Sequence, residues 1–353
     1  MKFGFLCRER GGGRGRVAVV GAGPAGLAAT GYLACLGYEV DVYDKLPYAG
    51  GLMMFAIPVH RIPPDNIIEG VEDLKDRLSV KFNFKVKVFV KDDSRHDEGD
   101  DFVERTIPLE DLITSYDAVL ITTGTWSSRK LGVEGENAIN VITALEYLYR
   151  WRLYEEKLLP NKPPSGKKVV VVGAGLSAVD AAEKAHMDGA EVNLVYRRTA
   201  AEAPAGLYNI RHLVSLGINF VELAQPVKVL NENRVAKGLE LVKMRLGEPD
   251  ESGRPRPIPV PGSEFVMEAD LIILAVGELP TPPFTSGYKS IATDKTGRIV
   301  VNEFHQTTIT NVFAAGDVVT GPSMIGKAFG SGLRAAKFLD NYLTHIAKQV
   351  AMA

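Results

Sequence analysis

The sequence predicts an α/β protein with two Rossmann-like dinucleotide-binding domains, one inserted in the other. Two segments carry this prediction, residues 17–45, VAVVGAGPAGLAATGYLACLGYEVDVYDK, and residues 169–198, VVVVGAGLSAVDAAEKAHMDGAEVNLVYRR, which align without a gap at an offset of 152. Each begins with an apolar β-run, turns at Gly-x-Gly, continues as a helix and ends in a second β-run. Similar strands follow, DAVLITTG at 117–124 and DLIILAVG at 270–277. Two such units predict two bound dinucleotides and electron transfer between them.

The composition excludes several classes of function. The length of 353 residues suggests about two domains, and 46% hydrophobic residues allow a core in each. The net charge of −2 gives no electrostatic reason to bind nucleic acid or an anionic membrane. No apolar stretch reaches the roughly 18–20 residues of a transmembrane helix, and the N-terminus lacks the apolar core of a signal peptide. We therefore expect a soluble enzyme with neither a nucleic-acid partner nor a membrane span.

The cysteine content narrows the chemistry further. Only Cys7 and Cys35 occur, with no Cys-x-x-Cys. We expect Cys35 to be a small buried residue of the first helix rather than half of a Cys7–Cys35 disulfide, and we expect a reducing cytoplasm. A cysteine-ligated iron–sulfur cluster usually needs four thiolates and is excluded. A thiol–disulfide reductase is excluded unless the two cysteines meet.

The positions of the two units predict the domain boundaries. Residues 1–16, with a basic Gly-rich run, are expected to form a flexible segment. The first domain is expected to comprise 17–125 and 285–353, and the second 126–284. The C-terminal block, with the strand TNVFAAGD and a long helix, has no nucleotide unit of its own. It is therefore expected to return and complete the first domain.

The elements of the first domain follow in order. A Gly- and Pro-rich loop at 46–66 precedes a helix near 66–78 and short alternating strands at 80–90. The acidic segment 91–105 is expected to be a solvated hairpin tip. His96 lies there among aspartates, but we favour an exposed turn over a metal site.

The second domain continues beyond its glycine-rich unit. A helix is expected at 208–216, strands near 218–222, and a hairpin at 239–266 with a Pro-rich centre. The final helix, from about 325 to 345, has an amphipathic pattern. It suits packing inside the chain or against a partner, so an oligomer is possible.

The glycine-rich turns are the candidate pyrophosphate sites, because glycines let backbone N–H groups approach the phosphates at a helix N-terminus. Alanine in place of the third glycine of the second copy is a variant that this pattern tolerates. Each following strand ends in a glycine, which suits a chain that passes close to a ligand. The candidates are Gly21, Ala22, Gly23, Pro24, Ala25, Gly26 and Gly124 in the first copy, and Gly173, Gly175, Leu176, Ser177, Ala178 and Gly277 in the second.

The two copies differ at the end of the second β-run, where cofactor identity is read. The first copy ends at Asp44, a carboxylate suited to the hydroxyls of an adenosine ribose, followed by Lys45. The second has Tyr196 at the equivalent position, followed by Arg197 and Arg198. Two guanidiniums without an acid favour a ribose 2′-phosphate and therefore NADP over NAD. The alternative is that both arginines are surface charges.

These motifs together resemble the FAD- and NADP-binding part of the glutamate synthase small (beta) subunit family, within the two-dinucleotide flavoproteins that include thioredoxin reductase. The resemblance extends from about residue 17 to 343. It rests on GAGPAGLA, YDKLPYAGGLMMFAIP, GTW at 124–126, GAGLSAVDAA, YRR and VFAAGDVV. It implies FAD in the first copy and NADPH in the second.

The resemblance also implies residues beyond the two glycine-rich turns. Gly51 and Leu52 would lie beside the flavin. Asp317, after Gly316, would bond the ribityl chain, with a simple helix or turn cap as the alternative. Backbone at Ile325 and Gly326 would face the N1–O2 edge of the flavin, where a helix N-terminus stabilises negative charge.

The resemblance to this family does not identify the electron acceptor. The glutamate synthase small subunit has a cysteine-rich N-terminal domain with iron–sulfur clusters, and this chain has only about 16 residues there. We expect a hydride to pass from nicotinamide C4 to flavin N5 without a catalytic side chain. We then expect the electrons to reach a separate iron–sulfur protein, either a ferredoxin or a glutamate synthase-like large subunit. The alternatives are a stand-alone NAD(P)H oxidase or diaphorase, and a non-catalytic flavin-binding subunit.

Overall fold

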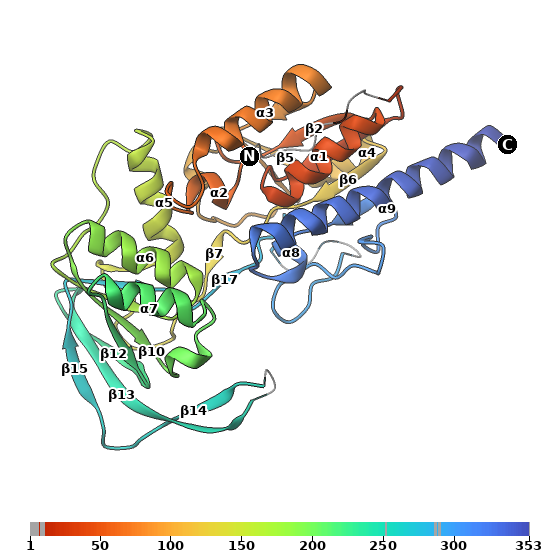
Figure 1. Ribbon diagram of the computed structural model, residues 1–353. Helices are drawn as coiled ribbons and strands as arrows, with labels where there is room; N and C mark the ends of the chain where they lie inside the picture. Colours follow the sequence, from red (N-terminus) through yellow and green to blue (C-terminus); the bar gives the residue numbers. More distant parts are fainter. Residues whose placement is uncertain (1–6, 8–10, 251–252, 286–287, 289–290, 353) are drawn as a thin grey trace. The chain divides into compact units, whose positions relative to one another are not determined.

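The computed structural model describes residues 7, 11–250, 253–285, 288 and 291–352, with the side chains of 347–352 left aside. The chain divides into two compact units (Figure 1). Unit 1 comprises Met1–Ser127 and Glu278–Ala353, and unit 2 comprises Ser128–Gly277. The predicted boundaries, after 125 and after 284, lie two and seven residues from the observed ones. Among the described residues, we find no helix with the length and apolar character needed to span a membrane.

Unit 1 is built on a parallel sheet of five strands in the order β18-β6-β1-β2-β3. Strands β1, β6 and β18 are apolar runs, as expected for strands buried on both faces, whereas the edge strand β3 is short and only partly buried. The return of the C-terminal block is confirmed, because β18 pairs with β6. The strands are β1 (Arg16–Val20), β2 (Glu39–Tyr43), β3 (Lys81–Asn83), β6 (Ala118–Ile121) and β18 (Val312–Ala314).

The helices of unit 1 follow from small and periodic apolar residues. Ala- and Gly-rich α1 lies side by side with the long α9 (Figure 1). A side chain at Gly332 of α9 would place its Cβ 2.0 Å from the Ala25 carbonyl oxygen, so this close approach requires glycine. The helices are α1 (Pro24–Leu36), α2 (Leu52–Phe55), α3 (Pro64–Leu78), α4 (Leu109–Ser115), α8 (Asp317–Thr320) and α9 (Ile325–Met352), with a 3₁₀ turn at η1 (Asp100–Phe102).

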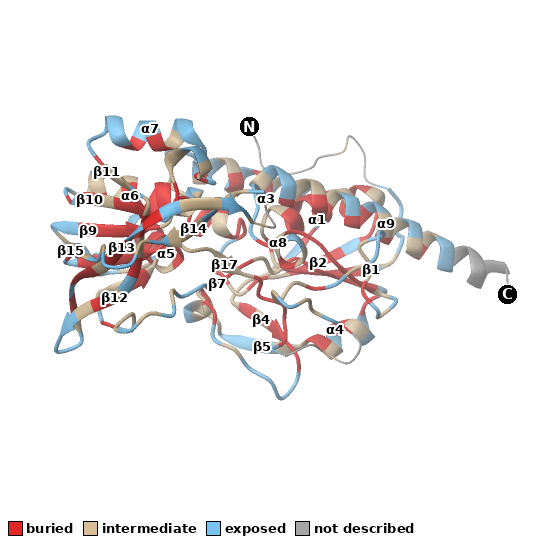
Figure 2. Cartoon of the chain, turned by 90° about the horizontal axis from the view of Figure 1, so that it is seen from below, coloured by how far each residue is buried: buried red, intermediate tan, exposed pale blue. Residues whose placement is uncertain are grey.

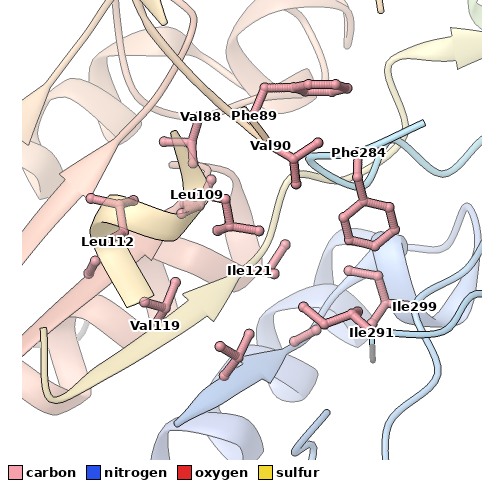
Figure 3. Close-up of a cluster of buried hydrophobic side chains, with 14 of the residues drawn as sticks. Val88, Phe89, Val90, Leu109, Leu112, Val119, Ile121, Phe284, Ile291 and Ile299 are labelled. Carbon is pink, nitrogen blue, oxygen red and sulfur yellow. The ribbon is translucent and has the colours of Figure 1, made fainter. Parts of the chain in front are cut away.

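Segments distant in sequence share one core in unit 1. Figure 3 shows apolar side chains of β6 and α4 gathered with residues of the C-terminal segment, among them Val119, Leu112 and Phe284. The small parallel pair β4 (Val86–Phe89) and β5 (Arg105–Pro108) adds to this cluster. The core therefore ties the N-terminal and C-terminal parts of unit 1 together.

Unit 2 repeats the sheet of unit 1. Its five parallel strands run in the order β11-β10-β9-β16-β8, with β9, β10 and β16 in the places of β1, β2 and β6. Figure 2 shows the inner strands β9 and β10 largely buried and the outer face of α7 exposed. The elements are β8 (Val141–Thr143), α5 (Ala144–Glu155), β9 (Lys168–Val172), α6 (Leu176–Met187), β10 (Glu191–Tyr196), η2 (Ala200–Glu202), α7 (Leu207–Ser215), β11 (Asn219–Glu222) and β16 (Leu271–Leu274).

A second, antiparallel sheet packs on the parallel sheet of unit 2. Its central strand β13 pairs with three others, and apolar residues of both sheets form one core. The predicted hairpin is present as β13 and β14, whereas β12 was not predicted. The strands are β12 (Ala224–Glu232), β13 (Val235–Pro249), β14 (Pro255–Pro259) and β15 (Phe265–Glu268). The short strands β7 (Ser127–Ser128) and β17 (Glu278–Leu279) occur where the chain leaves and re-enters unit 1.

The N-terminal segment contacts unit 1 at its described residues. Residues 1–6 and 8–10 lie outside the described residues, but the described part of this segment is attached to unit 1. The Gly11 amide donates to the Cys35 carbonyl at 2.9 Å, and Arg14 forms a 3.0 Å ion pair with Asp340 of α9. The described residues of this segment therefore contact unit 1, and the flexibility of the segment stays a prediction.

The cysteine prediction is wrong, because Cys7 and Cys35 form a disulfide. Cys35 is indeed buried, but it lies in the last turn of α1, where Gly11 of the N-terminal segment bonds its carbonyl. The disulfide removes the argument for a reducing compartment. It also removes the cysteine count as a ground for excluding thiol chemistry, so the position of the disulfide must decide that question.

Candidate cofactor sites

The glycine-rich turn of unit 1 has a different steric constraint at each glycine. Gly21 has φ +104°, and an added Cβ would lie 2.5 Å from the Thr122 carbonyl oxygen. A Cβ on Gly26 would lie 1.9 Å from the Gly21 carbonyl oxygen, whereas one on Gly23 would meet nothing within 4 Å. The first and third glycines are thus required by the fold. The second leaves open space beside the backbone, as the pattern for binding a phosphate requires.

The loop after β2 lies against this turn. The Gly50 amide donates to the Ala22 carbonyl at 2.8 Å. Gly51 has φ +54°, and its Cβ would lie 3.0 Å from the Gly23 Cα. The loop therefore brings Gly51 and Leu52, the first residue of α2, beside the open space at Gly23. The pairing of this loop with the turn is a contact that sequence spacing alone does not reveal.

The C-terminal segment reaches the other side of α1. A Cβ on Gly316, whose φ is +75°, would lie 2.7 Å from the Ala25 Cβ. Asp317 begins α8, and its carboxylate accepts a 2.6 Å hydrogen bond from the Ser323 hydroxyl and a 3.2 Å bond from the Ser323 amide. Burial raises the pKa of Asp317 above its ordinary value. Asp317 thus holds the turn between α8 and α9 rather than capping α8, which has no side-chain cap, and these bonds do not use all the lone pairs of the carboxylate.

The start of α9 supplies free backbone donors. The helix begins at Ile325, and a Cβ on Gly326 would meet nothing within 4 Å. The first N–H groups of any helix have no acceptor four residues earlier, and the helix dipole favours an anion there. Ile325 and Gly326 can therefore face a ligand that carries negative charge.

A pocket lies at the carboxyl ends of β1 and β2, and its lining includes Gly21, Asp44, Val88 and Trp126. Thr123 also lines it, and its buried hydroxyl has no hydrogen-bond partner within the described structure. A buried hydroxyl normally finds a partner, so a polar ligand group fits here. The carboxyl end of a parallel sheet is also the usual place for a dinucleotide.

Asp44 faces the glycine-rich turn from the end of β2. One carboxylate oxygen accepts a 2.6 Å hydrogen bond from the Ala22 amide, and the other accepts a 2.9 Å bond from the Leu46 amide. Burial raises the pKa of Asp44, although these two bonds oppose the effect. Each oxygen keeps a further lone pair. Asp44 can therefore hold the turn and still accept bonds from ribose hydroxyls.

Lys45 has a different environment from the one its place in the motif suggested. Its ammonium lies 2.9 Å from Asp100 and 5.0 Å from the centre of the Trp126 ring, and desolvation lowers its pKa. Lys87 pairs with the same Asp100. Burial opposes the shift, but Lys45 and Lys87 hold the pKa of Asp100 below its ordinary value. The ammonium of Lys45 thus anchors the chain around the pocket.

The segment 91–105 is therefore not a solvated tip throughout. Asp97 is 5% exposed and forms a 2.8 Å ion pair with Arg95. The segment folds back because its aspartates pair with lysines of β4 and the β2 end. His96 is exposed, and the described residues include no cluster of potential metal ligands.

The glycine-rich turn of unit 2 has the same frame. The Gly173 amide donates to the Val195 carbonyl at 2.9 Å, as the Gly21 amide does to Tyr43 at 2.8 Å in unit 1. A Cβ on Gly173 would lie 2.2 Å from the Ala275 carbonyl oxygen, whereas one on Gly175 would meet nothing within 4 Å. Ala178 fits at the third position and is fully buried. Leu176 and Ser177 form the first turn of α6.

The glycines that end the two later strands have matching contacts. The Gly124 carbonyl accepts a 2.9 Å hydrogen bond from the Thr281 amide, and the Gly277 carbonyl accepts a 2.8 Å bond from the Arg129 amide. Both have a positive φ. They turn the chain away from the sheet, and a direct contact with a ligand stays a prediction.

The arginines after β10 are not equivalent, which the sequence did not reveal. Arg197 is exposed. The side chain of Arg198 is 3% exposed; its Nε donates to the Pro255 carbonyl at 2.7 Å, and its Nη2 lies 2.6 Å from Asp250. Tyr196 turns its hydroxyl to the Glu202 carbonyl at 2.9 Å. The reading of both arginines as surface charges is therefore wrong for Arg198.

Comparison with known proteins gives this geometry a family. A family model described as pyridine nucleotide-disulphide oxidoreductase matches residues 15–332. The chain belongs to this family. It is an oxidoreductase of the pyridine nucleotide-disulphide family, and the resemblance to glutamate synthase small subunits is confirmed.

Several curated relatives of this family member are named as subunits or chains of larger enzymes. The chain is 37% identical over 334 residues to the NADP(+)-dependent formate dehydrogenase subunit beta of Moorella thermoacetica, covering 93% of this chain and 44% of that protein. It is 34% identical over 356 residues to the NADPH-Fe(3+) oxidoreductase subunit beta of Geobacter sulfurreducens, with 93% and 50% covered. It is 34% identical over 337 residues to the glutamate synthase (NADPH) small chain of Halomonas elongata, with 93% and 68% covered. The chain thus spans about half the length of the first two.

Solved structures show the same fold. FprA of Mycobacterium tuberculosis, in complex with NADPH, matches with a TM-score of 0.76 at 19% identity, covering 95% of this chain and 86% of that one. The thioredoxin reductase of T. acidophilum matches with a TM-score of 0.61 at 22% identity, covering 93% and 98%. The predicted two-dinucleotide flavoprotein fold is therefore confirmed.

Proposed function

We propose that unit 1 binds FAD, that unit 2 binds NADPH, and that the chain passes electrons from NADPH through the flavin to an acceptor outside the chain. The observation that carries this assignment is the contrast at the two strand ends. Asp44 offers a carboxylate for ribose hydroxyls. Arg197 and Arg198 offer guanidiniums for a 2′-phosphate.

In unit 1 the backbone does most of the binding in this proposal. The N–H groups of the glycine-rich turn hold the pyrophosphate, and the open space at Gly23 admits it. Asp44 holds the ribose, the Gly51–Leu52 loop lies beside the flavin, and Asp317 bonds the ribityl chain. The start of α9 at Ile325 and Gly326 stabilises negative charge. Remaining unit 1 positions proposed to contact FAD are Gly21, Ala22, Pro24, Ala25, Gly26, Lys45, Gly124 and Gly316.

In unit 2 the chain holds and orients the electron donor. Gly173, Gly175 and the α6 N-terminus at Leu176, Ser177 and Ala178 hold the pyrophosphate, with Gly277 close by. When bound, NADPH supplies a hydride and the flavin supplies its acceptor. No side chain of the protein needs to act as an acid or base in that transfer. The contribution of the chain is to bind the two cofactors and align them.

For the electron acceptor we propose a separate iron–sulfur protein, either a ferredoxin or a larger subunit. The support is that relatives covering 93% of this chain are named as subunits of a formate dehydrogenase, an NADPH–Fe(3+) oxidoreductase and a glutamate synthase. A stand-alone NAD(P)H oxidase or diaphorase is the alternative. A non-catalytic flavin-binding subunit is disfavoured, because it would have no need of Arg197.

The Cys7–Cys35 disulfide does not favour a thiol–disulfide reductase. Cys35 lies in the last turn of α1, and the glycine-rich turn precedes Pro24 at the other end. At a rise of about 1.5 Å per residue, the two ends are on the order of 16 Å apart. The disulfide therefore lies far from the site proposed for FAD.

One pair of variants tests which unit binds which cofactor. In Gly23→Val and Gly175→Val the added Cβ would meet nothing within 4 Å, so we expect both variants to fold. Each new side chain should block binding of the pyrophosphate in its own unit. We expect Gly23→Val to purify without flavin, and Gly175→Val to keep its flavin but not be bleached by NADPH without oxygen. Bleaching of Gly175→Val at the wild-type rate, or failure of the wild-type chain to bleach, would contradict the assignment.

The acceptor needs a separate measurement. NADPH oxidation by the wild-type chain would be followed with oxygen alone and with a purified ferredoxin. We expect ferredoxin to raise the rate at least about tenfold, a difference of roughly 1.4 kcal/mol in activation free energy. Equal rates with oxygen alone would favour the oxidase.

A further inference from the structure

Arg198 is held by a part of unit 2 that lies outside the glycine-rich unit. Its guanidinium donates to the Pro255 carbonyl at 2.7 Å and lies 2.6 Å from the Asp250 carboxylate. Asp250 follows β13 and Pro255 begins β14, so both ends of one hairpin contact this side chain. The result is a buried arginine with an acidic partner about 50 residues later in the chain.

The hairpin fixes the position of Asp250. The Asp250 amide donates to the Arg254 carbonyl at 2.8 Å, and the Gly253 amide donates to the Asp250 carbonyl at 2.8 Å. The Arg254 amide approaches the other carboxylate oxygen at 3.4 Å. The side chain of Asp250 is 28% exposed, whereas that of Arg198 is 3% exposed. The ion pair thus lies at the boundary with solvent, where an anion from solution can reach it.

A carboxylate and a phosphate monoester bind the same donor fork of an arginine. Arg198 stands two residues after the end of β10, where a dinucleotide places its adenosine ribose. In the cofactor-free chain, Asp250 therefore takes the place that a 2′-phosphate would take on Arg198. A dianionic phosphate is the stronger acceptor, but it must first displace this carboxylate.

We propose that Asp250 is a specificity-determining residue that competes with the 2′-phosphate of the pyridine nucleotide for Arg198. NADPH exchanges with the carboxylate, whereas NADH has no group that does so and leaves the ion pair in place. Asp250 thereby weakens the binding of NADPH selectively. The inference rests on the proposed NADPH site in unit 2.

The test measures binding without flavin chemistry. Adenosine 2′,5′-bisphosphate and 5′-AMP differ only by the 2′-phosphate, and both would be titrated calorimetrically into the full chain. We expect Asp250→Asn to bind the bisphosphate roughly three- to tenfold more tightly than wild type, as for removal of a competing, partly screened ion pair, with 5′-AMP unchanged. In the Arg198→Ala background, Asp250→Asn should have no effect.

A matched control separates this competition from a change in net charge. Glu268→Gln removes a carboxylate of β15 that pairs with Lys168 at 2.6 Å, also in unit 2. It should leave the ratio of the two affinities unchanged. Asp250→Ser removes the same carboxylate by a shorter side chain and gives the same test if the Asn variant does not fold.

The outcomes separate this inference from the function on which it rests. If wild type binds the bisphosphate no more tightly than 5′-AMP, the NADPH site itself is wrong. If wild type discriminates but Asp250→Asn binds the bisphosphate equally or more weakly, Asp250 does not compete and the inference alone fails. Equal tightening of both ligands would also overturn it.

Discussion

The two units share a backbone frame and differ in how the second strand ends. In both, the amide of the first glycine bonds the carbonyl near the end of the neighbouring strand, at 2.8 Å in unit 1 and 2.9 Å in unit 2. In unit 1, Asp44 then turns back to the Ala22 amide. In unit 2, Tyr196 turns away to Glu202 and two arginines follow. In our proposal the frame sets where a dinucleotide lies, and a few side chains at the strand end set which one binds.

The two units are also alike at the start of the first strand of each parallel sheet. Asp117 accepts a 2.7 Å hydrogen bond from the Arg16 amide, and Asp270 accepts a 3.0 Å bond from the Lys168 amide. Each aspartate precedes the strand beside the first strand of its sheet. The two halves are therefore repeats down to single side-chain contacts, so variants at matched positions can be compared directly.

Substitution at the third position of the glycine-rich turn should give the largest difference in stability between the two units. In Gly26→Ala the new Cβ would lie 1.9 Å from the Gly21 carbonyl oxygen, a backbone atom that cannot move aside. We expect a loss of roughly 3 kcal/mol or more in the free energy of unfolding, together with loss of flavin. The matched Ala178→Gly should cost only about 1 kcal/mol, from helix propensity. Denaturant unfolding checks both, and equal losses would show that the third position has the same role in each unit.

The second-largest loss of stability should come from removing the buried charge of Asp100. In Asp100→Asn the ammonium groups of Lys45 and Lys87 lose their shared carboxylate. We expect a loss of about 2–3 kcal/mol in the free energy of unfolding, at the low end for broken buried pairs, because the carbonyl oxygen of Asn can still accept a hydrogen bond from one of the lysines. Glu104→Gln is the control, because its 2.8 Å pair with Lys85 is exposed and should contribute under about 1 kcal/mol. Urea unfolding measures both, and similar losses would mean that Asp100 does not anchor the pocket wall.

The outcome at segment 91–105 shows what the sequence could and could not predict. The glycine-rich turns and parallel strands were predictable, because glycine spacing and apolar runs are local patterns. Asp100 was not, because its partner Lys45 lies 55 residues earlier. The same holds for Arg198, whose burial depends on a hairpin about 50 residues later, and for Cys35, whose pairing depends on where the N-terminal segment lies. Charges and thiols carry no local signal of a distant partner.

The two arginines should affect the choice of nucleotide. Replacing Arg197 and Arg198 together by Ala should raise the NADPH Michaelis constant about ten- to a hundredfold, since charge-assisted bonds contribute roughly 1.5–3 kcal/mol each and Asp250 already engages one arginine. The NADH constant should stay nearly unchanged. Lys237→Ala, which removes an exposed charge near the other end of β13, is the control. Equal effects on NADPH and NADH would show that the arginines do not contact the 2′-phosphate.

A smaller effect should appear in how the stability of unit 1 depends on pH. Burial raises the pKa of Asp44 above 3.8, its ordinary value. The folded state then favours the protonated carboxyl, so this stabilisation is complete below pH 3.8 and is lost as pH rises through the raised pKa. As pH rises through the pKa of Asp44, we expect the Asp44→Asn variant to become more stable relative to wild type. Thermal unfolding across this range measures the difference, with Glu39→Gln, an exposed carboxylate of β2, as the control. A difference that does not change with pH would contradict the prediction.

The smallest effect on electron flow should come from the disulfide. Cys7→Ser with Cys35→Ser removes the link between the N-terminal segment and the end of α1. Because the pair lies at the opposite end of that helix from the glycine-rich turn, the rate at which NADPH bleaches the flavin should stay within about twofold of wild type. Stopped-flow absorbance without oxygen measures it, with wild type in dithiothreitol as a second way to open the bond. A large fall in both samples would mean that the cysteines take part in the electron path, and the thiol–disulfide reductase would then become the better description of this chain.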